Sequence, residues 1–565
     1  MHCDQFKRRD SGLVSANTAI TMPAEFNQVV RNNEMKSPGT LSERHAAGLC
    51  RVATGALLAM VAAISPGSDA ARAAGNPPNI LLIECDSMDG RALGCMGHPA
   101  MRRATPNLDS LARQGALFRN AYTNNPICCP SRASMFSGLQ THHCEGWNNY
   151  KGLEPGAPTF LDRLAAAGYQ TQTLGKTDYL SGQHSMRARV SAWTRSANIE
   201  RPSYNEPAPM IRDRDEARVH GQDWKVTDRA IAWIREHRQN EKPFFLYLGL
   251  NVPHPAFVTS RTYTAMVDEA GIGIPPADEY DHPVMRYQRI VKNWKHGFSE
   301  ATIRKTRLTY FAMIAETDAM VGHLLAALDE LGLRDSTCVI FISDHGENAM
   351  EHHQFYKMNL YESSARVPLI IAGPGVQKGL QIAALTSLVD IHPTLMDMAR
   401  TSTPAGLDGH SLMPELRGQP SQRPDWVLSQ FHDTTCNTGS FMFRSGDWKY
   451  IAYPGCGPML FDLRADPDEV RNLASARPGL VRQMDERLRS IVDYKAVDAK
   501  VKAYDRASFA AWRAEMKAKG QYESLMSEIF SGADHVDASQ LKPWTAQDEA
   551  QIEKWLDQSC GVGPK

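Results

Sequence analysis

The apolar residues of this chain gather in short continuous runs separated by longer amphipathic stretches. Runs of this length fit strands that are covered on both faces of a sheet. Four are clear: 79–85 (NILLIEC), 243–251 (PFFLYLGLN), 338–344 (CVIFISD) and 367–373 (VPLIIAG). They predict the central strands of one sheet.

Helical periodicity fills the intervals between these runs. It is evident in 106–115, 223–238 and 299–333, and 159–176 is typical of a helix, a stop at Gly168 and then a strand. Strands that alternate with helices predict an α/β domain with a mainly parallel sheet flanked by helices.

The pattern changes after about residue 420. The segments 426–431, 440–453 and 459–463 are short, alternating and aromatic, with a glycine turn in the second. They predict a smaller antiparallel sheet in a C-terminal α+β subdomain. The expected organisation is an N-terminal extension (1–74), a catalytic domain (75–425) and a C-terminal subdomain (426–565).

The N-terminal extension contains an apolar stretch, 56–64, that follows Arg51 and precedes small residues. The stretch is too short to span a bilayer, and the pattern ending at Ala73 is typical of a signal peptide cleavage site. We therefore expect export to a secreted, periplasmic or lysosome-like location, without a stable membrane span. A buried helix, a membrane anchor or a disordered tail are the alternatives.

The net charge bears on which partners the protein can bind, and the cysteine count bears on its disulfides. A formal net charge of -1 over 565 residues provides no basic field for nucleic acid, so we expect no nucleic-acid partner.

Two of the 11 cysteines, Cys3 and Cys50, lie upstream of the expected cleavage. The remaining nine can form disulfides after export, but the odd number leaves at least one sulfur unpaired.

Polar residues cluster where the predicted strands end. Asp86 follows the first run and His254 comes soon after the second, while Asp344 ends the third run and is followed by His345. Ligands of open α/β sheets bind at the carboxyl ends of strands, and carboxylate oxygens suit Ca²⁺ or Mg²⁺. The sequence predicts a metal site there, although aspartates at such positions also serve as helix caps and in turns.

Two adjacent cysteines, Cys128 and Cys129, lie in 124–139 (NNPICCPSRASMFSGL). The residues alone fit four interpretations of this pair: a vicinal disulfide, metal ligands, core residues or a nucleophile. Lys176 and Lys357 are isolated lysines, and an isolated lysine is ordinarily a solvated surface residue. His254, between two prolines, and His282 fit either a positioned acid or base or a turn.

The segment 128–138 (CCPSRASMFSG) resembles the signature of the formylglycine-dependent sulfatases, in which cysteine precedes any residue and then Pro-Ser-Arg. Further sulfatase landmarks follow in order across about residues 77–475: Asp86, Lys176, the histidine in PHP, SDHGE (343–347) and Lys357. The stretches 145–153, 175–185 and 343–362 resemble the arylsulfatase K group, which are glucuronate-2-sulfatases acting on glycosaminoglycans. The resemblance implies an alkaline-phosphatase-like fold.

The resemblance also implies that a formylglycine-generating enzyme converts Cys128 to formylglycine. The hydrated aldehyde would attack the sulfur of a sulfated saccharide, and deprotonation of its second hydroxyl would then expel sulfate.

The other site roles are implied in the same way. Asp86, Asp344 and His345, with an oxygen of modified Cys128, would bind the metal, Ca²⁺ or alternatively Mg²⁺. Arg132 would orient them, Lys176 and Lys357 would bind sulfate, and His254 or His282 would protonate the leaving oxygen. His282 is also implied as a substrate contact.

Three positions depart from the common sulfatase pattern: Ser87 replaces a second aspartate, His345 replaces asparagine, and Asp178 replaces histidine. Asp89 is a candidate to replace the missing carboxylate, and His184 a candidate for the missing base. These departures recur in the arylsulfatase K pattern. A general arylsulfatase, a phosphomonoester or phosphonate-ester hydrolase, and a glycan-binding protein without activity remain alternatives.

Overall fold

The computed structural model describes residues 77–184, 186–199, 206–531 and 542–557. The expected N-terminal extension, its signal peptide and the cleavage near Ala73 lie outside the described residues.

The main sheet has eight strands in the order β10-β2-β9-β7-β1-β5-β3, with β8 paired to β2. The bounds are β1 (Asn79–Cys85), β2 (Ala116–Tyr122), β3 (Gln170–Gly175), β5 (Phe244–Gly249), β7 (Thr337–Ser343), β8 (Arg366–Val367), β9 (Leu369–Ala372) and β10 (Leu380–Ser387). β1 pairs in parallel with both β5 and β7, whereas β9 is antiparallel to its neighbours. The predicted mainly parallel sheet is confirmed.

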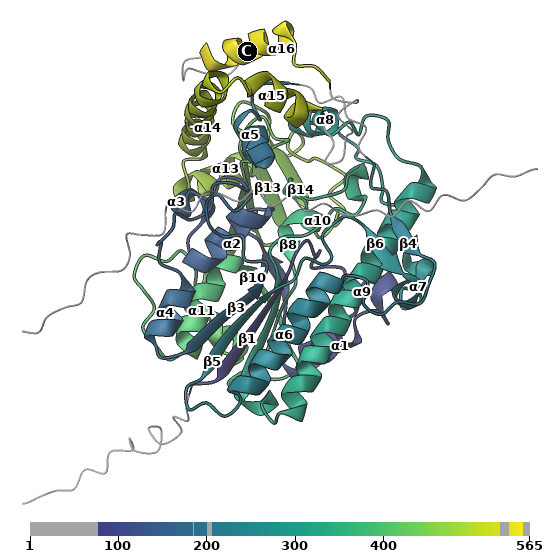
Figure 1. Cartoon of the computed structure of the whole chain (residues 1–565), viewed down its shortest axis with the longest axis vertical. Coiled ribbons are helices and arrows are strands. Elements are labelled where there is room, and N and C mark those ends of the chain that lie inside the picture. The colour runs from purple at the N-terminus through teal and green to yellow at the C-terminus, as the bar shows by residue number, and fades with distance from the viewer. Residues whose placement is uncertain (1–76, 185, 200–205, 532–541, 558–565) are drawn as a thin grey trace, which may run out of the picture. The chain divides into compact units, whose positions relative to one another are not determined.

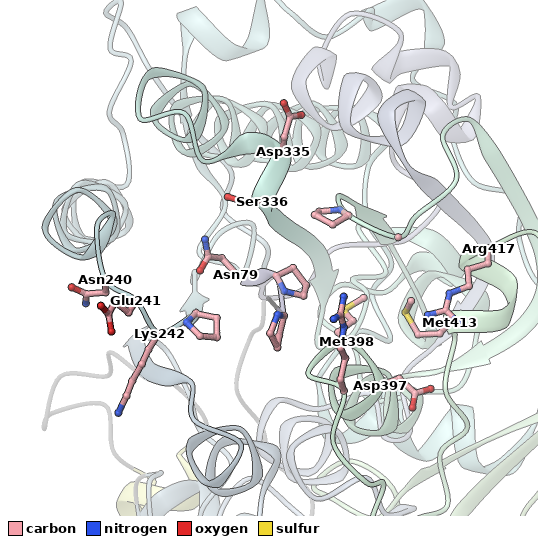
Figure 2. A pocket seen from close by; sticks show the side chains of 16 residues that line it. Asn79, Asn240, Glu241, Lys242, Asp335, Ser336, Asp397, Met398, Met413 and Arg417 are labelled. Atoms are coloured by element: carbon pink, nitrogen blue, oxygen red, sulfur yellow. The ribbon is translucent and has the colours of Figure 1, made fainter. Parts of the chain in front are cut away.

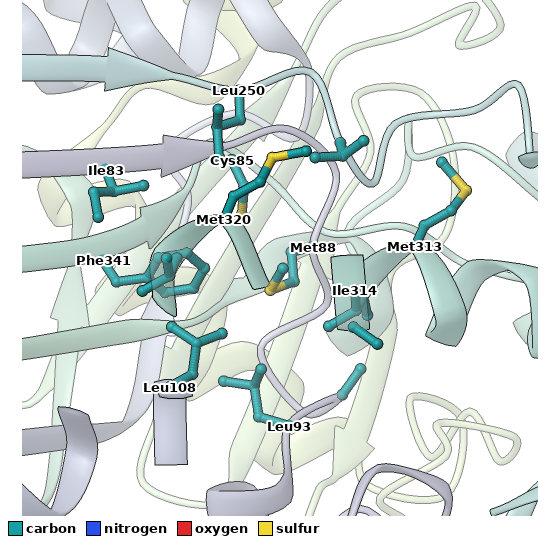
Figure 3. Close-up of a cluster of buried hydrophobic side chains, with 14 of the residues drawn as sticks. Ile83, Cys85, Met88, Leu93, Leu108, Leu250, Met313, Ile314, Met320 and Phe341 are labelled. Atoms are coloured by element: carbon teal, nitrogen blue, oxygen red, sulfur yellow. The ribbon is translucent and has the colours of Figure 1, made fainter. Parts of the chain in front are cut away.

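Alternate residues of the central strands enter two separate cores, one on each face of the sheet. On β1, Leu81 and Ile83 point to one face, whereas Ile80 and Leu82 point to the other. Figure 3 shows Ile83 in the first of these cores. This burial on both faces explains why the strands are continuously apolar.

Helices cover both faces of the sheet (Figure 1). The first core contains residues of α1 (Pro106–Gln114), α6 (Gly221–His237) and α9 (Glu300–Glu330), and the second contains residues of α2 (Cys128–Ser137), α4 (Phe160–Ala166) and α11 (Ile391–Met398). Among the described helices, only α9 is long and apolar enough to cross a membrane, and 72% of its most apolar window is buried. It is a core helix.

A separate four-stranded antiparallel sheet follows, in the order β11-β12-β13-β14. Its strands are β11 (Trp426–Phe431), β12 (Ser440–Ser445), β13 (Trp448–Ala452) and β14 (Met459–Asp462). One face packs on α13 (Pro478–Ile491), and the other packs on residues near the carboxyl end of β2, such as Tyr122 and Ile127. The predicted second sheet is confirmed, and a domain boundary at 425/426 stays a prediction.

A last hydrophobic cluster joins distant parts of the sequence. It contains residues of α5 (Met186–Trp193), α14 (Tyr494–Ala518), α15 (Tyr522–Phe530) and α16 (Ala546–Asp557). Figure 1 shows these helices together above the carboxyl ends of the main-sheet strands. The C-terminal helices therefore hold α5 beside the end of the sheet that carries the predicted site.

Candidate active site

Cys128 is the first residue of α2, a helix whose ten residues are all buried. Its Sγ lies 3.4 Å from Nε2 of His345 and 3.6 Å from Oδ2 of Asp86. The positive end of the helix dipole is therefore directed at this position, which favours negative charge there. Since the eight described cysteines are all free, Cys128 and Cys129 form no vicinal disulfide in this structure.

The register of β1 and β7 pairs Cys85 with Ser343, so the residues that follow them, Asp86 and Asp344, leave the sheet side by side. Asp86, Cys128, Asp344 and His345 are all buried, and their ligand atoms lie within 4.8 Å of one another. Nδ1 of His345 lies 2.9 Å from the carbonyl oxygen of Gly346, to which it donates as N–H. Nε2 then presents its lone pair to the cluster.

This set of donors fits a divalent cation. It offers two carboxylates and a neutral imidazole, and Cys128 would supply an oxygen if it were converted to formylglycine, as the resemblance implies. The carboxylates are those that Ca²⁺ and Mg²⁺ prefer, whereas imidazole is a softer ligand, so the donor set does not assign the metal.

Arg132 lies one helical turn after Cys128 and is fully buried beneath the cluster. Its Nε and Nη2 donate to Oδ2 of Asp344 at 3.0 and 2.9 Å. Its Nη1 donates to the Tyr247 hydroxyl at 2.6 Å and to the Lys176 carbonyl at 3.1 Å. These contacts fix the orientation of the Asp344 carboxylate.

Lys176 reaches the cluster from the end of β3 and forms an ion pair with Asp86. A Cβ on Gly249 would lie 1.8 Å from the Lys176 carbonyl oxygen, so only glycine lets β5 approach the chain here. Nζ of Lys176 also lies 3.2 Å from Oδ2 of Asp178, which in turn lies 3.2 Å from Nε2 of His184. His184 is thus linked to the cluster through two charged groups.

The electrostatics of Asp86 place further residues near it. Burial by itself would raise the pKa of Asp86, but the charges of Lys176 and Lys357, and of His254 when it is protonated, outweigh burial and hold the pKa well below its usual value. The charge of Lys357, which is buried, also acts on Cys128. The structure therefore brings both predicted lysines and His254 to the same carboxylate.

The shifted pKa values of two side chains bear on the chemistry. Burial, followed by the charge of Lys357, lowers the pKa of His254 to about 3, so the imidazole is neutral in the free enzyme. Its Nδ1 donates to the Pro255 carbonyl. Burial and Asp86 raise the pKa of Cys128, which is opposite to the lowered pKa of a cysteine that acts as a thiolate nucleophile.

Two candidates from the sequence occupy other environments. His282 caps α8 (Pro283–Val291): Nδ1 accepts from the Val284 N–H at 3.3 Å, and Nε2 lies 2.7 Å from the Gly457 carbonyl. Asp89 forms a salt bridge with Arg91 at 2.7 Å. Both ring nitrogens of His282 and the carboxylate of Asp89 thus already have partners in this structure.

Glu84 and Tyr247 are site residues that the sequence reasoning missed. Both are fully buried, the Tyr247 hydroxyl donates to Oε2 of Glu84, and Nη1 of Arg132 lies 3.3 Å from the same oxygen. Burial raises the pKa of Glu84 to about 7 against the opposing charge of Arg132. The available signal was a carboxylate inside an otherwise apolar strand.

A cavity of about 550 Å³ lies far from this chemistry, at the amino ends of the strands (Figure 2). Its lining includes Asn79, the first residue of β1, and Ser336, which precedes β7. The candidate site is at the opposite, carboxyl ends of those strands, as expected for an open α/β sheet.

Several known proteins resemble this chain. Residues 78–401 match the family model described as Sulfatase, and residues 350–493 match one described as N-sulphoglucosamine sulphohydrolase, C-terminal. Arylsulfatase K of Gallus gallus is 42% identical over 511 residues, covering 85% of this chain and 93% of the relative. Arylsulfatase K of Homo sapiens is 42% identical over 482 residues, covering 80% and 89%.

Solved structures share the fold. A phosphonate monoester hydrolase of Agrobacterium radiobacter has a TM-score of 0.60 at 24% identity, covering 73% of this chain and 95% of its own. A 2-O GAG sulfatase has a TM-score of 0.60 at 23% identity, covering 76% and 96%. The family match spans more than half of the chain and contains the cluster around Cys128. This chain therefore belongs to the sulfatase family, and its relatives in that family include the arylsulfatase K proteins.

Proposed function

We propose that this sulfatase is an exported enzyme that removes the 2-O-sulfate of a terminal glucuronate or related hexuronate from glycosaminoglycan-type oligosaccharides. The observation that carries the proposal is the buried cluster in which Cys128 contacts Asp86 and His345, near two lysines whose charges act on Asp86. The similarity to arylsulfatase K, together with the sequence stretches shared with that group, supports the choice of uronate.

The cationic side chains account for the binding of a sulfate ester. Lys176 and Lys357 bring positive charge to the position of Cys128, where sulfate oxygens would accept hydrogen bonds and where negative charge grows in the transition state. Arg132 is already bound to Asp344 and Glu84, so it positions the carboxylates.

The modification and the metal would supply the chemistry that these side chains lack. Conversion of Cys128 by a formylglycine-generating enzyme would provide a hydrated aldehyde as nucleophile. Asp86, Asp344 and His345 would hold Ca²⁺ or Mg²⁺, which would polarise the sulfate oxygens.

Proton transfer is assigned to two histidines. The Nδ1–H of His254 donates to the Pro255 carbonyl, which leaves Nε2 to contact the ester oxygen. The negative charge of a bound sulfate ester would raise the pKa of His254, so that the imidazolium can donate its Nε2 proton to the leaving oxygen. The pair of His184 and Asp178 is linked to Lys176 and is the proposed base that accepts the proton of the second hydroxyl. His282 stays a predicted substrate contact.

The substrate is tested with oligosaccharides that differ only in whether the terminal uronate carries a 2-O-sulfate. We expect release of inorganic sulfate from the oligosaccharide that carries the 2-O-sulfate. We expect none from the oligosaccharide that lacks it. Activity on aryl sulfates without release of sulfate from any 2-O-sulfated uronate would contradict the proposed substrate and favour a general arylsulfatase.

A second candidate function follows from the shared fold of the phosphonate monoester hydrolase, since one fold can host the hydrolysis of different esters. Sulfate, phosphate and phosphonate esters of one phenol, assayed on one preparation, separate the two. We expect the highest kcat/KM for the sulfate ester, and a preference for either phosphorus ester would favour the second candidate.

A further inference from the structure

Arg189, on α5, has a pattern of contacts that the reaction described above does not use. Its guanidinium carbon lies 3.9 Å from the ring centre of Tyr150 and 4.2 Å from that of Trp193. Nη1 donates to the Tyr150 hydroxyl at 2.7 Å. In the described part of the chain no carboxylate pairs with Arg189, and its buried Nε has no partner.

These contacts fix the plane of the Arg189 guanidinium between the two rings and leave its Nε–H without an acceptor. A stacked guanidinium keeps its N–H groups in the plane of the fork, where they match the two oxygens of a carboxylate. A buried donor without a partner is unfavourable unless a ligand satisfies it. Arg189 therefore has the charge and the shape to bind a planar anion.

Arg189 is also close to the opening of the site. Asp86 and His345 are fully buried, whereas the side chains of Lys176, Asp178 and His184 are 15%, 23% and 21% exposed. Solvent thus reaches the cluster along the 176–184 segment, and α5 begins two residues after that segment ends.

The loop that carries Tyr150 connects this opening to Cys129, the residue after Cys128. The Asn149 side chain accepts from the Cys129 N–H at 3.1 Å, and the Tyr150 carbonyl accepts from the Gly182 N–H at 2.9 Å. The Tyr150 hydroxyl lies 3.8 Å from where a Cβ on Gly182 would be. Tyr150 and the guanidinium stacked on it therefore border the 176–184 segment.

We propose that Arg189 binds the carboxylate of the same uronate whose 2-O-sulfate occupies the cluster; the assignment rests on the proposed function. A 2-sulfated uronate carries two anions on opposite sides of one rigid ring. While Lys176 and Lys357 hold the sulfate, the carboxylate needs a separate cation outside the cluster. Arg132 is unavailable because it is buried against Asp344 and Glu84. Arg189 thus determines specificity for uronates over neutral sugars.

The test compares kcat/KM for a 2-O-sulfated glucuronide with that for its carboxyl-reduced, 2-O-sulfated glucoside. The wild-type enzyme should prefer the glucuronide. Arg189→Met should reduce this preference by about 10- to 100-fold, the value of one to two charge-assisted hydrogen bonds. Arg189→Lys should keep part of the preference. Arg218→Met is the matched control, because Arg218 stacks on Trp224 at 4.7 Å and pairs with exposed Asp228.

Tyr150→Phe provides a second, less disruptive variant, since it removes the hydroxyl that orients Arg189 and should give a smaller loss of the preference. An Arg189→Met enzyme that retains the full wild-type preference would overturn the assignment while leaving the uronate substrate in place. A wild-type enzyme that cleaves neither sugar but cleaves aryl sulfates would overturn the proposed substrate and the assignment together.

Discussion

Replacing Arg132 by methionine removes a cation that is completely buried against both Asp344 and Glu84. The side chain makes five hydrogen bonds: two to Asp344 and one each to Glu84, Tyr247 and the Lys176 carbonyl. Breaking a buried ion pair by removing one partner costs about 3–5 kcal/mol. We expect Arg132→Met to lose this much free energy of unfolding.

Arg132→Lys separates charge from geometry. The lysine keeps the positive charge but cannot present a planar fork to Asp344 while reaching Tyr247, so we expect a smaller loss of about 1–3 kcal/mol. Its affinity for the metal should still fall by about 10- to 100-fold, since a residue that orients a metal ligand is lost.

The assay is urea unfolding of chelator-treated protein, followed by the fluorescence of its 10 tryptophans. Arg218→Met is the control, because its ion pair with Asp228 is about half exposed and such pairs contribute about 1 kcal/mol or less. If Arg132→Met unfolds within about 1 kcal/mol of the control, the reasoning about the buried network is refuted.

Three further predictions follow from the site. Chelation should abolish sulfatase activity, and Ca²⁺ or Mg²⁺ should restore it; activity that persists in chelator would remove the metal from the account. Lys176→Met should raise the pKa of Asp86, because the largest charge opposing burial is lost. The stability that ionised Asp86 contributes is present above its unfolded-state pKa of about 4 and is lost as pH falls through the folded value. Acid unfolding of the chelated variant should therefore begin at a higher pH than in wild type, and superimposable curves would contradict this. His282→Ala should lose about 1 kcal/mol of stability through its helix cap and His282→Asn should recover it; a kcat/KM that recovers together with stability would exclude the predicted substrate contact.

Much of the fold was predictable because the central strands are buried on both faces and read as unbroken apolar runs. β2 and β10 were not predicted. β2 carries half-buried Arg119 and Asn120 in its middle, and β10 is an edge strand with partly exposed positions, so neither has a clear run or alternation. α2 was not predicted because all of its faces are buried, so its sequence lacks the alternation of apolar and polar faces that marks an amphipathic helix.

The site divides in the same way. Asp86 and Asp344 were predictable as neighbours because parallel strands end at one edge. Position 128 and Lys357 needed the resemblance, since a helix start and a loop bring them to that edge. Glu84 was hidden inside a strand, and the contacts of Arg189 depend on packing between α5 and the loop of Tyr150, which no local pattern encodes.

The central claim, that position 128 acts as formylglycine in a sulfatase, is tested most directly by mass spectrometry of the tryptic peptide 120–132 from protein made in its native host. The account predicts that Cys128 has lost its sulfur and gained an aldehyde oxygen, while Cys129 remains a thiol, in preparations that hydrolyse sulfate esters. Active protein in which Cys128 is entirely an unmodified cysteine would contradict it.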